Sequence, residues 1–333
     1  MFIYLNPNWN IINLFLMKKI IYTLSVVFMI MANVAYANNN VKDVKDIYTT
    51  EYAKEIVYFL TQKKFMGREA GKKASLPVIK FLENEFAKIG CEVIKQPITS
   101  ADLYEAKGEP KKGTVYPNMI YNVIGKIEGS DPNKIVVVGA HFDHLGKKKG
   151  LGIHPGADDN ASGIVALLSL AKMMKATGCT PKYTVLFCAW DGEEKGLLGS
   201  RYFVHNWYKN RTQTDSIVHY MNFDMVGRTA TPENPTVTFA WNNNYPYLLD
   251  ICKEAQKEIP APFNVILDER KGDGKGGSDY APFSKKDIPF IAWMEEELHS
   301  DYHKPTDTPD KLHWEKLKKT TLLAYGILER LVF

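Results

Sequence analysis

Four short segments of the chain are rich in histidine and acidic residues, and each lies next to an apolar run. They are His141–Asp143, Asp158–Asn160, Asp191–Glu194 and Asp224. Carboxylates that lie together repel one another and raise each other's pKa unless cations neutralise them. Mixed imidazole and carboxylate ligands suit zinc or another first-row divalent ion. The pattern therefore predicts a metal site, provided that the fold brings these segments together.

The apolar runs beside these segments indicate strands that are covered on both faces. We expect strands at 134–139, 183–190, 219–225 and 290–294. Helical spacing of apolar residues predicts helices at 48–61, 74–90 and 162–177, and from Trp314 to the end. The polar stretches 101–118 and 268–278 are predicted to be loops. This alternation is typical of an α/β layered fold around a largely parallel sheet, in which ligands bind beyond the carboxyl ends of the strands.

Composition excludes several classes of protein. The 333 residues include 42 Lys+Arg and 38 Asp+Glu, a net charge of +4, so the chain lacks the basic excess typical of nucleic-acid binding. Its 45% of hydrophobic and 24% of charged residues are ordinary for a folded protein. None of the four cysteines forms a Cys-x-x-Cys pair, which excludes a cysteine zinc ribbon.

The N-terminus has the pattern of a secretory signal peptide. Lys18 and Lys19 precede an apolar run and the small-residue site Ala35-Tyr36-Ala37. We expect residues 1–37 to be removed after Ala37, with 1–16 a possible upstream mis-start because Met17 begins the pattern. The alternative is an uncleaved membrane anchor, but the apolar run is short for a span of about 20 residues. The mature protein is then secreted or periplasmic, without stable membrane association, and export permits disulfides whose pairing the sequence does not select.

Six spaced motifs carry a resemblance to a known family. They are GAHFDHLG (139–146), PGADDNASG (155–163), AWDGEEKGLLGS (189–200), NFDMVGR (222–228), GGSDYAPF (276–283) and HSDYHKPTDT (299–308). Upstream, FMGREAGKKA (65–74) is similar to the segment with which the family's domain begins. The chain resembles peptidase family M28, the co-catalytic zinc aminopeptidases and their relatives, from about residue 48 to the end. The resemblance implies one three-layer α/β/α catalytic domain over 48–333, with a mixed, mostly parallel sheet, preceded by a linker at 38–47.

The resemblance also implies a site that holds two Zn²⁺, although other first-row divalent metals are possible. The first ion takes His141 and Asp224, the second takes Glu194 and His303, and Asp159 bridges them. A cis peptide bond is expected between Asp159 and Asn160.

Further roles come from the same resemblance. Glu193 is implied as the general base that activates water, and Tyr302 as the hydrogen-bond donor to the developing oxyanion. Asp143 is expected to support the His141 ring through its second nitrogen, as metal-bound histidines usually require. Asp279 is expected to lie behind the ligands.

The chain departs from the family's common pattern in two places. Tyr280 stands where many relatives have histidine, which concerns the pocket rim rather than the metal ligands. The run Glu295–Glu297 stands where small or apolar residues are usual, and a solvated loop is the favoured interpretation. In the alternative, this run recognises the amino group of a peptide, so Glu297, together with Met225, is a candidate substrate-binding residue.

These observations favour a secreted metallo-aminopeptidase that acts on peptides and leaves the oligomeric state open. A carboxypeptidase or dipeptidase is the nearest alternative. A one-zinc glutaminyl cyclase shares the fold, but the adjacent Glu193 and Glu194 favour a site with ligands for two ions. A non-catalytic binding protein is the third alternative, although every expected ligand position is filled.

Overall fold

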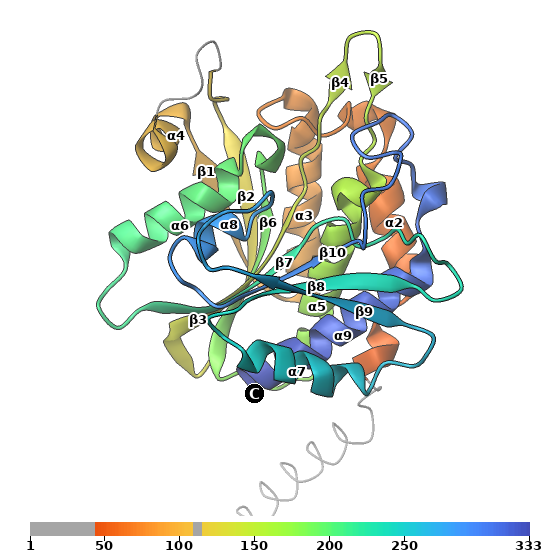
Figure 1. The fold of residues 1–333 in the computed structure, drawn as a ribbon. Helices are drawn as coiled ribbons and strands as arrows, with labels where there is room; N and C mark the ends of the chain where they lie inside the picture. The colour runs from red at the N-terminus through yellow and green to blue at the C-terminus, as the bar shows by residue number, and fades with distance from the viewer. Residues whose placement is uncertain (1–43, 109–114) are drawn as a thin grey trace, which may run out of the picture. The chain divides into compact units, whose positions relative to one another are not determined.

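A computed structural model describes residues 44–108 and 115–333, and Lys45–Phe333 form one compact unit (Figure 1). Its helices are α2 (Thr50–Leu60), α3 (Leu76–Ile89), α4 (Ser100–Lys107), α5 (Gly163–Ala176), α6 (Leu198–Asn210), α7 (Tyr247–Gln256), α8 (Ala281–Ser284) and α9 (Trp314–Val332). Its strands are β1 (Glu92–Ile98), β2 (Ile120–Ile127), β3 (Asp131–His141), β4 (Lys147–Lys148), β5 (Gly152–Ile153), β6 (Tyr183–Trp190), β7 (Ser216–Phe223), β8 (Thr236–Asn242), β9 (Asn264–Arg270) and β10 (Phe290–Met294). The expected signal peptide lies outside the described residues.

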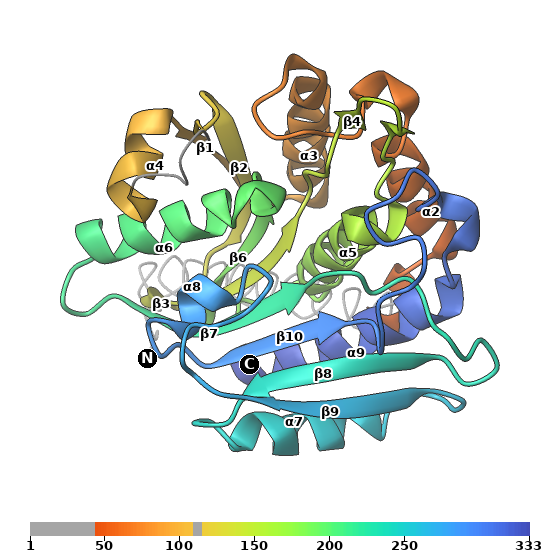
Figure 2. The same cartoon turned by 45° about the horizontal axis from the view of Figure 1, so that its top comes forward.

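Eight of the strands form one mixed sheet in the order β1-β2-β6-β3-β7-β10-β8-β9 (Figure 2). The four central strands β6, β3, β7 and β10 are parallel to one another. Antiparallel pairs flank them, with β2 against β6 on one side and β8 against β10 on the other. Because the central strands are parallel, their carboxyl ends meet at one edge of the sheet.

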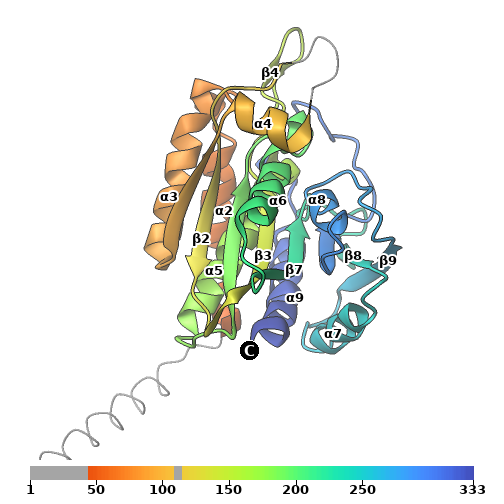
Figure 3. The ribbon, with the colours of Figure 1, turned by 90° about the vertical axis from the view of Figure 1, so that its left-hand side faces the viewer.

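Helices cover both faces of this sheet, which confirms the three-layer α/β/α prediction. On one face α3 packs on β1 and β2, while α5 packs on β3, β6 and β7, with α2 and α9 beside α5. On the other face α6 packs against β2 and α8, and α4 lies on α6 (Figure 3).

The helix predicted at 162–177 is the most deeply buried helix of the sheet's first face. We expected one apolar face, yet α5 is buried from Gly163 through Ala171 and again at Met173 and Met174. The reason is that its outer side is covered by α2, α3 and α9. The helix therefore lies inside the layer and fixes the loop that enters it, residues 157–162.

Two of the predicted loops contain regular structure. Within 101–118 lies α4, which begins with a capping box between Thr99 and Asp102 but has only Leu103 buried. Within 268–278 lie the last residues of the edge strand β9, whose residues are exposed or half-buried. Both elements lack a repeating buried face, so hydrophobic periodicity could not reveal them.

The four cysteines are free thiols, and Cys188 is buried on β6. In the part of the chain that the structure describes, no helix is long and apolar enough to span a membrane.

Candidate active site

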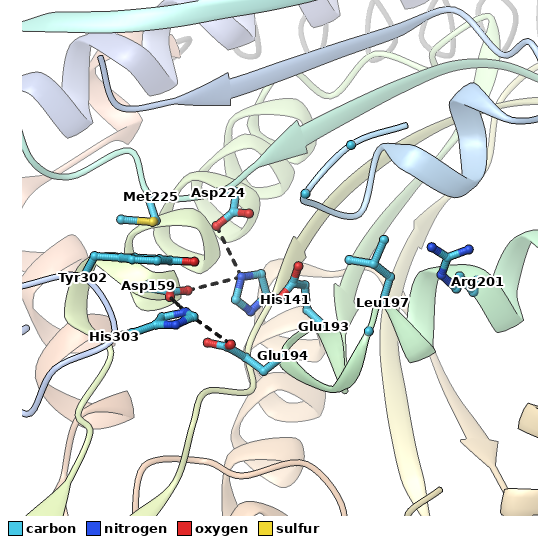
Figure 4. A pocket seen from close by; sticks show the side chains of 13 residues that line it. His141, Asp159, Glu193, Glu194, Leu197, Arg201, Asp224, Met225, Tyr302 and His303 are labelled. Atoms are coloured by element: carbon cyan, nitrogen blue, oxygen red, sulfur yellow. Dashed lines mark hydrogen bonds and ion pairs between the residues drawn. The ribbon is translucent and has the colours of Figure 1, made fainter. Parts of the chain in front are cut away.

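The carboxyl ends of the parallel strands bring the predicted ligand residues together. His141 ends β3, Asp224 directly follows β7, and Glu193 and Glu194 lie in the turn after β6. Asp159 comes from the loop that enters α5. Figure 4 shows these side chains converging, with His303 facing Asp159 and Glu194.

The converging atoms form two groups that share Asp159. In the first group, His141 Nε2 lies 3.4 Å from Asp159 Oδ1 and 3.3 Å from Asp224 Oδ1. In the second group, His303 Nε2 lies 3.2 Å from Asp159 Oδ2 and 3.3 Å from Glu194 Oε2. One oxygen of Asp159 therefore serves each group.

These separations suit long hydrogen bonds and also ligand atoms around a cation. Nitrogen–oxygen hydrogen bonds most often measure about 2.9–3.0 Å, which is shorter than all four distances. Tetrahedral zinc with bonds of about 2.0–2.1 Å places neighbouring ligand atoms about 3.3 Å apart. The donor set of imidazoles and carboxylates therefore has the chemistry and the spacing that zinc or another first-row divalent ion requires.

Asp143 and His144, which follow His141 in the chain, position other residues of the site. His141 Nδ1 lies 3.1 Å from the main-chain oxygen of Asp143, whereas the Asp143 carboxylate lies 3.8 Å away. That carboxylate instead accepts hydrogen bonds from the main-chain N–H groups of Glu193 and Glu194, at 2.9 and 3.3 Å. His144 Nδ1 lies 2.7 Å from Glu194 Oε1, which is a hydrogen-bond length. Asp143 thus holds the β6 turn, and His144 orients a proposed ligand.

The loop that carries Asp159 is fixed at both sides. The carboxylate of Asp307 accepts hydrogen bonds from the main-chain N–H groups of Asp158 and Asp159 at 3.0–3.1 Å. The Asn160 side chain donates to Phe223 O at 2.8 Å, at the end of β7. The peptide bond between Asp159 and Asn160 is cis, as the family resemblance predicted. The loop that carries Asp159 is therefore tied to the strand that precedes Asp224.

A buried arginine joins three segments behind the site. The guanidinium of Arg68 is fully buried and donates to the carbonyl oxygens of Leu60, Phe142, Pro155 and Gly156 at 2.5–3.0 Å. These acceptors belong to the end of α2, the residue after His141 and the loop before Asp158. Burial lowers the pKa of Arg68 to about 10, with nearby carboxylates opposing the shift, so the group stays charged at neutral pH.

The charges around the site are strongly coupled. Burial, supported by Asp224 and Asp279, raises the pKa of Glu193 well above its ordinary value. Burial also disfavours the charge on Glu194, but hydrogen bonds with His144 and His303 outweigh it and hold the pKa of Glu194 well below its usual range. Hydrogen bonds with Asp159 and Glu194 raise the pKa of His303 to about 10. A carboxyl that binds a proton more readily than usual thus lies beside Glu194, whose charge its neighbours stabilise.

The site opens into a pocket of about 400 Å³, the catalytic pocket below. Its lining comprises His141, Asp159, Glu193, Glu194, Gly196, Leu197, Arg201, Asp224, Met225, Gly276, Gly277, Tyr302 and His303. Three non-glycine lining residues, Leu197, Met225 and His303, have φ of 56–61°. Such left-handed backbone is costly for these side chains and is often found at functional sites. No sequence signal marks these three conformations.

Asp279 and Tyr302 differ in their access to the pocket. Asp279 is buried and absent from the pocket lining, its Oδ1 accepts a hydrogen bond of 2.5 Å from Ser200, and burial raises its pKa to about 6. Tyr302 lines the pocket, stacks on His303 with ring centroids 3.8 Å apart, and directs its hydroxyl toward the ligand group (Figure 4). Burial and the surrounding carboxylates raise the pKa of Tyr302, so its phenol stays a hydrogen-bond donor.

The run Glu295–Glu297 is not a solvated loop, in contrast to the favoured sequence interpretation. Glu295 is buried, Glu296 accepts hydrogen bonds from Thr229 and the main chain of Ala230, and only Glu297 is exposed. Burial raises the pKa of Glu295 to about 9, an effect that Asp158 strengthens. The run borders a second hollow of about 340 Å³, the acidic recess, which shares Asp224, Met225, Gly277 and Tyr302 with the catalytic pocket. Its other lining residues are Arg270, Ser278, Tyr280, Met294, Glu295, Glu296, Glu297 and Leu298. Arg270 is paired with Asp268, so the carboxylates dominate the charge of the recess.

Four positioning residues escaped the sequence analysis. Arg68 and Asp307 act on main-chain atoms far away in the sequence, so no spacing rule could find them. His144 lies within the first motif, but its contact with Glu194 depends on the fold. Asn160 was expected to follow a cis bond, but not to tie its loop to β7.

The sheet is mostly parallel, and its strand ends carry two histidine–carboxylate groups that share one aspartate. These features define an α/β protein with a candidate metal site. The model of peptidase family M28 matches residues 122–327, so this chain belongs to that family.

Sequence relatives include named peptidases. The chain is 32% identical over 169 residues to leupeptin-inactivating enzyme 1 of Streptomyces exfoliatus, which covers 51% of this chain and 34% of that protein. It is 29% identical over 225 residues to aminopeptidase Y of Saccharomyces cerevisiae, covering 62% of this chain and 38% of that protein. The chain thus spans little more than a third of the length of these relatives.

Solved structures share the fold at low sequence identity. BSAP, a zinc aminopeptidase from Bacillus subtilis, superposes with a TM-score of 0.67 at 17% identity, over 86% of this chain and 95% of that chain. A glutaminyl cyclase from Bacteroides thetaiotaomicron gives 0.64 at 19% identity, over 85% of this chain and 98% of that chain. Because an aminopeptidase and a cyclase match almost equally well, these likenesses establish the fold and not the reaction.

Proposed function

We propose that the protein is an aminopeptidase that hydrolyses the N-terminal residue of peptides with two Zn²⁺ ions. The observation that carries the proposal is the position of Glu193, which lines the catalytic pocket beside two ligand groups that share Asp159. His141 and Asp224 hold one ion, Glu194 and His303 hold the other, and Asp159 bridges them. Its M28 membership and the named aminopeptidases among its relatives support this reading.

The proposed chemistry divides between the ions and the chain. When bound, the ions lower the pKa of a shared water and polarise the scissile carbonyl. Glu193, which lines the pocket beside both ligand groups, would take a proton from the attacking water and pass it to the leaving amine. Tyr302 donates a hydrogen bond to the oxygen on which negative charge develops.

The acidic recess supports a preference for free amino ends. A substrate ammonium is attracted by the carboxylates of Asp224 and Glu297, which line this recess. The apolar side chains of Met225, Met294 and Leu298 lie there too and offer a surface for the first side chain of the peptide. An N-terminal residue with an aliphatic side chain therefore matches the recess in both charge and polarity.

The test is cleavage of leucine peptides by the full-length mature protein, with free and with acetylated N-termini. We expect hydrolysis of the free peptides only, complete loss after metal removal and recovery when zinc is added back. Glu193→Gln preserves the ligands but removes the base, so its kcat should fall by about 10²–10⁴-fold at unchanged metal content. Release of amino acids by metal-free protein, or unchanged kcat in Glu193→Gln, contradicts the proposal.

Metal content and product separate the alternatives on the same fold. Two equivalents of zinc per chain at full activity support the hydrolase, whereas one equivalent with cyclisation of N-terminal glutamine supports a glutaminyl cyclase. Release of C-terminal residues from N-acetylated peptides indicates a carboxypeptidase.

We also propose that the protein is secreted or periplasmic after cleavage behind Ala37, leaving a single catalytic domain over 48–333. The basic pair Lys18-Lys19, the apolar run and Ala35-Tyr36-Ala37 support this location. N-terminal sequencing of the mature protein should begin at Asn38, and an intact N-terminus in a membrane fraction contradicts cleavage.

A further inference from the structure

A second groove continues from the catalytic pocket on the side away from the acidic recess. This basic groove has a volume of about 400 Å³ and is lined by Ala106, Arg201, Val204, His205, Tyr208, Lys209, Pro282, Lys285 and Lys286. Arg201 belongs to its lining and to the lining of the catalytic pocket, so one side chain joins the two hollows. Figure 4 places Arg201 at the far side of the pocket from Tyr302, beyond Glu193 and Leu197.

The groove is positively charged and only partly neutralised. Lys209 and His205 contact Glu105 on α4, at 2.5 and 3.5 Å. Arg201, Lys285 and Lys286 have no carboxylate within ion-pair distance in residues 44–108 and 115–333. No acidic side chain from these ranges lines the groove. Several positive charges therefore face this hollow without a fixed counter-ion.

Arg201 is half-buried and lines both hollows, and the buried carboxylate of Asp279 acts on it electrostatically. Its Nε is buried and lacks a hydrogen-bond partner among the described residues, so a ligand in the groove meets the outer part of the guanidinium. A carboxylate fits best, because its two oxygens match the planar guanidinium.

The two hollows beside the catalytic pocket thus carry opposite charge. The acidic recess lies on the side of Tyr302 and Met225, and the basic groove lies beyond Arg201. A peptide has the same polarity, with an ammonium at one end and carboxylates toward the other. A substrate whose amino end enters the acidic recess leaves the catalytic pocket across Arg201.

We propose that the basic groove selects peptides that carry a carboxylate one or two residues beyond the scissile bond. This proposal rests on the aminopeptidase function above and names its substrate class. The carboxylate comes either from an aspartate or glutamate side chain or from the C-terminus of a short peptide. Half-exposed ion pairs contribute up to about 1 kcal/mol, or roughly fivefold in kcat/KM.

The experiment compares matched peptides that differ only in charge. All begin with a free leucine: Leu-Glu amide against Leu-Gln amide, Leu-Ala-Glu amide against Leu-Ala-Gln amide, and Leu-Ala as free acid against its amide. The first two pairs report a side-chain carboxylate, and the third reports the C-terminus. We expect kcat/KM to be about fivefold higher for the acidic member of at least one pair at low salt. This acidic-to-neutral ratio should fall toward one at high salt, because screening weakens exposed charges.

Variants assign this preference to the groove. Arg201→Gln should bring the acidic-to-neutral ratio close to one, and Arg201→Lys should retain most of it. The control is Lys253→Gln, which removes an exposed lysine of α7 outside the groove and should leave the ratio unchanged. A wild-type ratio near one with efficient cleavage of neutral peptides overturns the groove proposal while aminopeptidase activity stands. A ratio that Arg201→Gln does not alter overturns it equally.

A binding measurement separates the two proposals. If no peptide is cleaved, the proposed function fails, and fluorescence anisotropy of a dye-labelled Leu-Ala-Glu peptide then tests the groove. If the glutamate peptide binds more tightly than the glutamine peptide, and Arg201→Gln removes this difference, the groove proposal is upheld. Equal binding of both peptides to the wild type overturns it.

Discussion

Replacing Arg68 by methionine tests whether one buried cation holds the metal site together. Methionine fills similar space but offers no donor, so the carbonyls of Leu60, Phe142, Pro155 and Gly156 lose their shared partner. Removing one side of a buried charged network costs about 3–5 kcal/mol, because buried groups are left unpaired. That cost is a large share of the 5–15 kcal/mol by which folded domains are typically stable.

Urea unfolding of the mature protein measures this effect. With a slope of about 3 kcal/mol per molar urea, the midpoint should fall by about 1 M or more. Three of the four lost contacts fix the backbone beside His141 and before Asp158, so zinc affinity should fall by about 10–100-fold as well. The urea midpoint and the zinc affinity of Arg68→Lys should lie between those of the wild type and Arg68→Met, since one ammonium group cannot make all the hydrogen bonds of a planar guanidinium.

The matched control is Arg330→Met on α9. Arg330 is partly exposed and pairs with Glu258, so its loss should cost no more than about 1 kcal/mol. If Arg68→Met has the urea midpoint and zinc affinity of the wild type, Arg68 does not organise the site and the reasoning is refuted.

Three further predictions concern other parts of the molecule. Burial lowers the pKa of His219 to about 4, so the folded state excludes a proton that the unfolded chain binds below its ordinary pKa of 6.5. The stability that this exclusion provides is complete above pH 6.5, and about 3 kcal/mol of it is lost as the pH falls to 4. In urea titrations over a pH series, His219→Gln should flatten the pH dependence of the unfolding free energy in this range. An unchanged slope contradicts the prediction. Asp307→Ala leaves the main-chain N–H groups of Asp158 and Asp159 unpaired, which should weaken zinc binding by about 10–100-fold in a chelator competition. Wild-type zinc affinity in this variant would contradict the prediction. Of the four cysteines only Cys179 is exposed, so a thiol reagent should label the native protein once, with mass spectrometry as the readout and labelling of Cys188 as the contrary result.

The sequence predicted those elements that have a continuous buried face. The strands β6 and β10 match their predicted ranges residue for residue, because both are apolar along their whole length. Strand β1 escaped notice because it is an edge strand with mostly exposed or half-buried residues and with Pro97 near its end. Helix α4 escaped because Leu103 is its only buried residue, although its capping box was visible in the sequence.

Within the site, the sequence predicted residues more successfully than contacts. The expected ligand residues His141, Asp159, Glu194, Asp224 and His303 lie together, and the cis bond is present. Their roles as ligands stay predictions until metal is measured. The second layer of contacts could not be predicted, because main-chain atoms are the partners of Arg68 and Asp307. Such partners leave no trace in residue types.

The proposed ligands are spread over the chain from His141 to His303, on five segments that meet only at the sheet edge. An unfolded chain therefore has no preformed cation site, and any ion bound there adds its binding free energy to the stability of the fold. At a free ion concentration a thousand times Kd, this addition is about 4 kcal/mol. Under the proposed function, metal supply decides how long the folded protein survives proteolysis as well as whether it is active, and activity begins only when the last ligand segment has folded.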